Sequence, residues 1–324
     1  MLDNDSLITA YILDGQGGGK SLDWDEINNW SEADGVLWVH LDYTTNESQN
    51  WLMEKSGLDA IVVSALMSDD PRPRSAVMQN GLLVMLRGVN MNPGADPEDM
   101  VSIRLWIDGN RIISTRRRKL LSVSGLAQAI SSGTGPISTG EFLVDLTFRL
   151  VERMAYVVDG IEDRADLLEE QVLNLQSYQL RTQISQLRRE AISLRRYLAP
   201  QRDAMTRLYN EKVPWLDETH RMQIREVADN IMRYVEDLDA VRERAIVIQE
   251  ELMSRISEQM DKRMYVLSMV AAIFLPLGFL TGLLGINVGG IPGAEYKGAF
   301  YVFCGILSVT VIVQIFVFKK LKWM

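Results

Sequence analysis

The stretch YVLSMVAAIFLPLGFLTGLLG, residues 265–285, contains 21 residues without a charged side chain. A helix of about 20 apolar residues crosses the hydrocarbon core of a bilayer. A second uncharged stretch, AFYVFCGILSVTVIVQIFVF, covers residues 299–318 and is long enough for the same role. The sequence therefore predicts a transmembrane domain over residues 264–324, with spans at about 265–285 and 299–318. Isolated polar residues in them, Thr281 and Gln314, are tolerated where helices meet.

Basic residues stand before the first predicted span and after the second: Lys262, Arg263, Lys319, Lys320 and Lys322. The loop between the spans holds only Glu295 and Lys297 as charged residues. Positive charge close to a span marks the cytoplasmic side of the membrane. We therefore expect both termini in the cytoplasm, and an outer-mouth loop with Glu295 and Lys297 on the other side.

The rest of the chain is acidic, because residues 1–263 carry 30 Lys+Arg against 42 Asp+Glu. A nucleic-acid partner is not expected, since phosphate backbones require a basic face. The acidity fits a surface that attracts cations, and it equally fits one that only keeps the domain soluble. His40 and His220 are isolated and Cys304 is the only cysteine. The sequence therefore predicts no tetrahedral zinc site, no intrachain disulfide and no enzyme active site.

Residues 1–137 predict a cytoplasmic α/β domain. Short β-type runs are separated by turn signals, and they lie at residues 7–13, 36–41, 82–87, 101–107 and 111–115. Asp108, Gly109 and Asn110 between the last two runs predict a hairpin. We expect a helix over residues 47–66 and a rigid extended connector over residues 69–74.

Residues 138–263 predict a stalk region, because strand signals end there and apolar residues recur at helical spacing. We expect three long helices over residues 139–174, 177–209 and 218–284. The third has no proline before Pro276, so it can continue from the cytoplasm into the membrane. A coiled-coil bundle with no transport role is the alternative. The fold class predicted from these parts is an α+β membrane protein.

Three motifs carry a resemblance to a known family. The first span ends in GLLGIN at residues 282–287, residues 72–74 read RPR, and residues 194–202 read LRRYLAPQR. With the two-span C-terminus, this order of motifs resembles the CorA superfamily of divalent-cation channels. The usual Gly-Met-Asn ending of that superfamily has Ile286 in place of Met here, which is similar to the ZntB zinc-transport branch.

The resemblance implies a homopentameric funnel in the bacterial inner membrane, with a pore lined by the first span of each copy. Gly285, Ile286 and Asn287 would form the selectivity filter, and a ring of Asn287 amides would hold a hydrated cation. It further implies proton-linked uptake of zinc. We expect related cations such as cadmium, nickel and cobalt to pass as well, and we predict no cofactor besides the transported cation. Several copies are needed in any case, because two spans cannot enclose a polar pathway.

Helical spacing back from the end of the first span predicts a pore-lining stripe: Gly282, Gly278, Leu275, Ala271, Leu267, Met264, Asp261, Ser257 and Glu250. Leu275, Leu267 and Met264 can form hydrophobic constrictions that gate by dewetting. Asp261 and Glu250 can form acidic rings that gather cations near the inner mouth. Ordinary packing between helices is the alternative, since small residues four apart are common at any helix interface.

The identity of the ion depends on the ligands that the pathway offers. Zinc prefers Cys and His ligands, and the first span and the loop after it contain neither. Zinc would therefore pass largely hydrated, with loose selectivity over similar ions. The first span also lacks Asp, Glu and His, so proton coupling has no obvious carrier there. Three alternatives stay open: a magnesium or cobalt channel, a zinc efflux protein, and a membrane-anchored coiled-coil sensor or scaffold.

Overall fold

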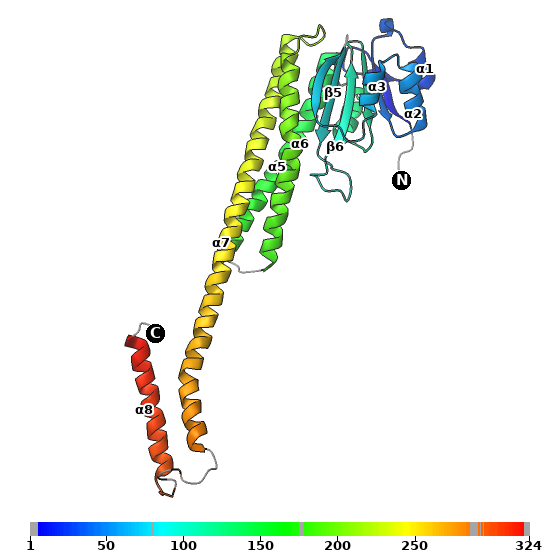
Figure 1. Cartoon of the computed structure of the whole chain (residues 1–324). Coiled ribbons are helices and arrows are strands. Elements are labelled where there is room, and N and C mark those ends of the chain that lie inside the picture. Colours follow the sequence, from blue (N-terminus) through cyan, green and yellow to red (C-terminus); the bar gives the residue numbers. More distant parts are fainter. Residues whose placement is uncertain are drawn as a thin grey trace. The chain divides into compact units, whose positions relative to one another are not determined.

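The computed structural model describes residues 6–78, 81–174, 178–285, 291, 293 and 295–320. It divides into two compact units, Met1–Gln249 and Glu250–Met324. The first unit holds the sheet and the helices that cover it, and the second holds the two apolar helices. Both units are drawn in Figure 1.

A seven-stranded sheet forms the centre of the first unit, in the order β2-β1-β3-β7-β6-β5-β4. Its strands are β1 (Leu7–Leu13), β2 (Gly19–Ser21), β3 (Val36–Asp42), β4 (Arg74–Met78), β5 (Gly81–Gly88), β6 (Val101–Ile107) and β7 (Arg111–Arg116). Only β3 and β7 pair in parallel among the described strands. The five predicted strands are confirmed to within a residue or two, and so is the hairpin between β6 and β7. The short strands β2 and β4 were not predicted.

Both faces of the sheet are buried at its central strands β3, β5, β6 and β7, which explains why these strands are largely apolar on both sides. Successive side chains of a strand point to opposite faces. Leu37, Val39 and Leu41 of β3 join one core, beneath α1 (Trp24–Asn28) and α3 (Ala60–Leu66). Trp38 points the other way and packs edge-to-face with Phe142, with 4.9 Å between the ring centroids.

The predicted single helix over residues 47–66 is wrong. The chain instead forms α2 (Asn46–Asn50), a π-helical turn (Trp51–Lys55) and α3. Gly57 separates them with φ of +67°, a conformation that glycine adopts readily and that ends a helix. Asp59 then starts α3 by accepting a hydrogen bond from the Ile61 N–H at 2.8 Å.

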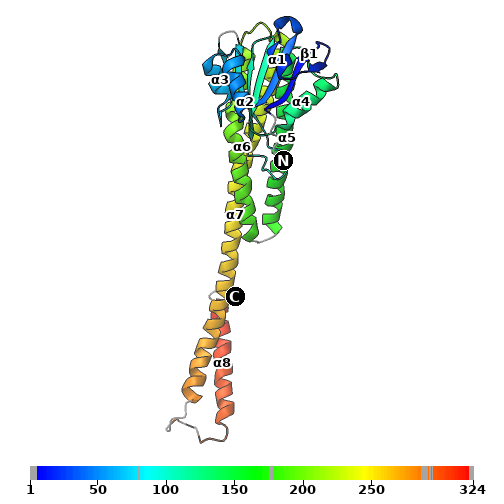
Figure 2. The ribbon, with the colours of Figure 1, turned by 90° about the vertical axis from the view of Figure 1, so that its right-hand side faces the viewer.

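Four further helices complete the first unit: α4 (Leu121–Ser131), α5 (Thr139–Asn174), α6 (Tyr178–Asn210) and α7 (Glu218–Gly285), which continues into the second unit. The three predicted long helices are confirmed. Figures 1 and 2 show α5, α6 and the N-terminal part of α7 side by side. Ion pairs join them, as where Arg244 of α7 lies 2.5 Å from Asp166 of α5.

The motif LRRYLAPQR at residues 194–202 joins helix α6 to the sheet. The Gln201 side chain is buried and pairs with the backbone of Arg87 in β5: its Oε1 accepts from the Arg87 N–H at 2.6 Å, and its Nε2 donates to the Arg87 carbonyl at 3.0 Å. The Arg87 guanidinium lies over the Tyr197 ring, 4.0 Å from its centre. The segment LRRYLAPQR therefore holds α6 to β5, and this role needs no contact with an ion.

Acidic side chains of α5 and α7 face each other on the first unit. Partial burial, and then the carboxylates Asp237, Asp159 and Asp166, raise the pKa of Glu162. A carboxyl whose pKa is raised on folding favours the native state while it is protonated, and this contribution is lost as the pH rises through the folded pKa.

We expect Glu162→Gln to raise the thermal unfolding midpoint of the protein near neutral pH, because the amide removes a carboxylate that the native state disfavours. The gain should vanish as the pH falls below about 4, where the wild-type carboxyl is protonated as well. Thermal scans at several pH values measure this, with exposed Glu152→Gln as the control. An unchanged or lower midpoint at neutral pH would contradict it.

Candidate ion pathway

The second unit contains the C-terminal part of α7 and the antiparallel helix α8 (Ala299–Lys320), which lies beside it. Both helices are long and apolar enough to cross a membrane, and their most apolar windows have no buried residue within the single chain. Leu275 is 74% exposed and Phe300 is 70% exposed. So much apolar surface is not left to water in a soluble protein, so lipid or further protein covers it.

One face of α7 packs toward α8. Its half-buried residues recur at helical spacing: Met269, Ala272, Ile273, Pro276, Leu277 and Leu280. This face contacts α8 at Ala272, whose carbonyl oxygen lies 3.4 Å from Nε2 of Gln314 in α8.

The predicted pore stripe lies on the other side of α7. Met264, Leu267, Ala271, Leu275, Gly278 and Gly282 are all exposed in the single chain. A Cβ built on Gly278, Gly282 or Gly285 would meet no atom within 4 Å. At about 100° per residue, the stripe and the face toward α8 are close to opposite. The structure thus leaves the whole stripe uncovered by its own chain.

The two acidic residues of the stripe, Glu250 and Asp261, differ in their ion pairing from nearby carboxylates of α7. Glu251 and Glu258 form ion pairs on another side of α7, with Arg255 at 2.5 Å and with Lys262 at 2.9 Å. The hydrogen bond from Lys262 lowers the pKa of Glu258. Among the described residues, neither Glu250 nor Asp261 takes part in an ion pair, and both are exposed, as is Ser257. The two carboxylates for which acidic rings are predicted thus have no ion-pair partner within the described part of the chain.

The predicted selectivity filter is described only at Gly285, the last residue of α7. Ile286 and Asn287 lie outside the described residues, so the filter stays a prediction. Glu295 and Lys297 of the outer-mouth loop are both exposed.

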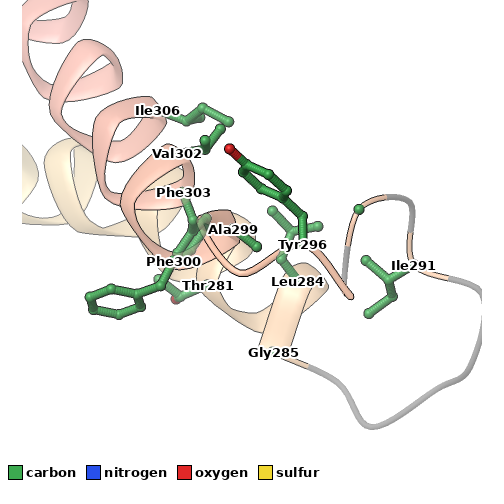
Figure 3. A pocket seen from close by; sticks show the side chains of 11 residues that line it. Thr281, Leu284, Gly285, Ile291, Tyr296, Ala299, Phe300, Val302, Phe303 and Ile306 are labelled. Carbon is green, nitrogen blue, oxygen red and sulfur yellow. The ribbon is translucent and has the colours of Figure 1, made fainter.

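A cavity of about 560 Å³, which was not predicted from the sequence, lies between the end of α7, the loop and the start of α8. Figure 3 shows its lining, with the Tyr296 side chain directed toward Val302 and Ile306. The Thr281 hydroxyl at its edge already donates to helix carbonyls, at 3.0 Å from Leu277. The side chains that the structure describes in this lining are mainly apolar.

No group of three His, Cys, Asp or Glu side chains that could hold a metal ion occurs within the described part of the chain. His40 is buried between Trp38 and Ser114, and burial followed by the Arg116 charge lowers its pKa to about 3. This histidine is a neutral member of the core.

Comparison with known proteins assigns the family. The family model for the CorA-like Mg2+ transporter protein matches residues 33–320. The chain belongs to the CorA-like family of divalent-cation transporters, and members of this family are not enzymes.

Individual relatives cover nearly the whole chain. It is 39% identical over 325 residues to the divalent cation transporter CmaX of Pseudomonas aeruginosa, which covers 99% of this chain and 98% of the relative. It is 36% identical over 317 residues to the zinc transport protein ZntB of Yersinia pseudotuberculosis, and the match covers 98% of this chain and 96% of the relative. The structure of full-length CmaX matches with a TM-score of 0.86 at 39% identity, covering 99% of this chain and 100% of that one. The predicted resemblance and the predicted fold class are confirmed.

Proposed function

We propose that this protein carries zinc, and with it cadmium, nickel and cobalt, across the bacterial inner membrane through a pore on the axis of a homo-oligomer. The observation that carries the proposal is the stripe on α7, which is continuous from Glu250 to Gly282, faces away from α8 and changes from acidic to small and apolar. Such a surface suits a passage in which cations gather at an acidic entrance and then pass apolar constrictions.

Several copies are needed because the two spans of one chain cannot surround water. In a closed ring, each copy would present its α7 stripe to the axis and leave α8 toward the lipid. We propose five copies, as the resemblance to the CorA superfamily implies. In this arrangement the domains are the cytoplasmic α/β domain of residues 1–137, the stalk of residues 138–263 and the transmembrane domain of residues 264–324, with both termini in the cytoplasm.

The choice of zinc rests on the ending Gly285, Ile286 and Asn287 and on relatives that are named zinc transport proteins. A neutral ring of Asn287 amides can hold the water shell of a small dication without binding it too tightly for release. A magnesium or cobalt channel is the second candidate, because the matching family model is named for Mg2+ and CmaX is named only for divalent cations.

Zinc uptake by the purified protein in liposomes tests the function. Zinc should enter faster than magnesium, and an inward proton gradient should accelerate entry if uptake is proton-linked. Faster magnesium entry would select the second candidate. A scaffold that only tethers a coiled coil would give no flux of either ion, and outward-directed zinc flux would favour efflux.

Asn287→Ala should impair zinc uptake severalfold while the oligomer stays intact, because alanine removes the amide oxygens that would face the hydrated cation. Size-exclusion chromatography checks the assembly, and uptake over a range of zinc concentrations measures the loss. Unchanged uptake would remove Asn287 from the filter.

A further inference from the structure

Pro276 interrupts the hydrogen bonding of α7 in the middle of the first span. In an α-helix, the N–H of each residue donates to the carbonyl four positions before it. Proline has no N–H, so Pro276 leaves the carbonyl of Ala272 without its usual donor, although the helix continues from Glu218 to Gly285. In the hydrocarbon core such a carbonyl needs a donor from elsewhere in the protein.

Gln314 of α8 supplies that donor. Its Nε2 lies 3.4 Å from the Ala272 carbonyl oxygen, which is long for a hydrogen bond but directed at the one carbonyl that Pro276 frees. The acceptor fixes which end of the amide faces α7, since only the NH2 group can donate. Its Oε1 is buried and has no partner among the described residues. The contact with α7 is thus made by the donor end of Gln314.

Other polar side chains of α8 are satisfied within their own helix. The Ser308 hydroxyl donates to the Cys304 carbonyl, and the Thr310 hydroxyl donates to the Ile306 carbonyl, both at 2.9 Å. These bonds are local and hold no other helix. Gln314 differs because its hydrogen bond joins the two helices that form the second unit.

The hydrogen bond between Gln314 and Ala272 lies close to the residues of α7 that form the pore stripe. Pro276 follows Leu275 of the stripe directly, and two stripe glycines, Gly278 and Gly282, lie on its C-terminal side. Helices bend most easily at proline, where the ladder is interrupted and the ring meets the preceding turn. Any change in bend at Pro276 alters the position of Leu275 relative to the glycines.

We propose that Gln314 is a positioning residue for transport: by donating to the Ala272 carbonyl that Pro276 frees, it holds α7 in the bend that sets its pore stripe. This inference rests on the proposed role of α7 as the pore helix. Gln314 does not touch the ion, and it acts through the backbone of Ala272.

The test is a double-mutant cycle between Gln314 and Pro276 in the full-length protein. Gln314→Met keeps the length and much of the volume of the side chain but removes the donor. Pro276→Ala returns a backbone N–H that can donate to Ala272. The wild type, both single variants and the double variant are reconstituted for zinc uptake, and their unfolding temperatures are measured in detergent. Thr310→Val is the matched control, since it removes a polar group of α8 that does not reach α7.

We expect Gln314→Met to lower uptake on the order of three- to tenfold and to lower the unfolding temperature. In the Pro276→Ala background the same change should have little effect on either quantity, because Ala272 then has a donor within its own helix. Thr310→Val should leave both near the wild-type values.

Equal effects of Gln314→Met in the two backgrounds would overturn the proposal, because the glutamine would then act independently of the freed carbonyl. Coupling in the unfolding temperatures with uptake unchanged in all four proteins would overturn the positioning role. A wild-type protein that carries no zinc would refute the proposed function instead, and the four unfolding temperatures would still decide whether the hydrogen bond exists.

Discussion

Gly282→Trp should reduce divalent-cation uptake to the level of empty liposomes. The Cβ position of Gly282 is open in the single chain and belongs to the exposed face of α7 that lies away from α8. If copies of this face surround the axis, each copy adds an indole to a passage that is already apolar at Leu275. Bulky apolar rings at a constriction both narrow it and favour its dewetting.

Gly305→Trp is the matched control for this experiment. Gly305 lies in α8, is exposed, and has no atom within 4 Å of its Cβ position. A tryptophan there should face lipid and leave most of the uptake intact. Both variants are compared by isotope or dye uptake after size-exclusion chromatography has confirmed the oligomer. Normal uptake by an assembled Gly282→Trp protein, or equal losses in both variants, would show that the stripe does not line the pathway.

Gln201→Leu should lower the stability of the first unit strongly. The substitution leaves the buried N–H and carbonyl of Arg87 without partners, and each buried polar group left unpaired costs roughly 1–3 kcal/mol. Domains are stable by only about 5–15 kcal/mol, so the combined effect is a large share of the total. Chemical or thermal unfolding followed by circular dichroism measures the shift.

Gln183→Leu provides the comparison for this second experiment, because Gln183 lies on the same helix but is exposed. It should change the unfolding midpoint little. The unfolding midpoint of Gln201→Glu should lie between those of Gln201→Leu and Gln183→Leu. A carboxylate can still accept a hydrogen bond from the Arg87 N–H, but it cannot donate one to the Arg87 carbonyl. Similar midpoints for Gln201→Leu and Gln183→Leu would mean that water or a rearranged backbone satisfies Arg87.

The elements with strong periodicity could be predicted from the sequence, and those set by tertiary contacts could not. The three long helices carry their signal over many turns, so their bounds were correct to about a residue. Strand β4 was missed because DDPRPR, whose last residue Arg74 begins the strand, indicates only an extended connector, and the pairing with β5 leaves no signal of its own in the sequence. The helix over residues 47–66 failed at Gly57, where a single left-handed residue outweighs the apolar pattern on both sides.

In the candidate pathway too, some features could be predicted from residue spacing and others depend on tertiary contacts. Spacing alone placed the stripe on one face of α7, and the structure adds that α8 covers the opposite face. The role of Gln314 was beyond the sequence, because a lone glutamine in a span is compatible with many partners. Only the position of α8 shows that the partner of Gln314 is the Ala272 carbonyl, which Pro276 leaves without its usual donor. The LRRYLAPQR motif signalled the family, but its contacts show that Gln201 and Tyr197 act in the join between α6 and the sheet.

Both margins of the sheet are protected against added strands. At one margin β4 is contacted by α6, and the Ser75 hydroxyl donates to the Ala204 carbonyl of that helix at 2.9 Å. At the other margin β2 has only three residues and is contacted by α4. Short or covered margins resist the strand-to-strand recruitment that leads to fibrils. Pairing between the β-sheets of neighbouring copies is thus disfavoured, so copies can be crowded together without their β-domains polymerising.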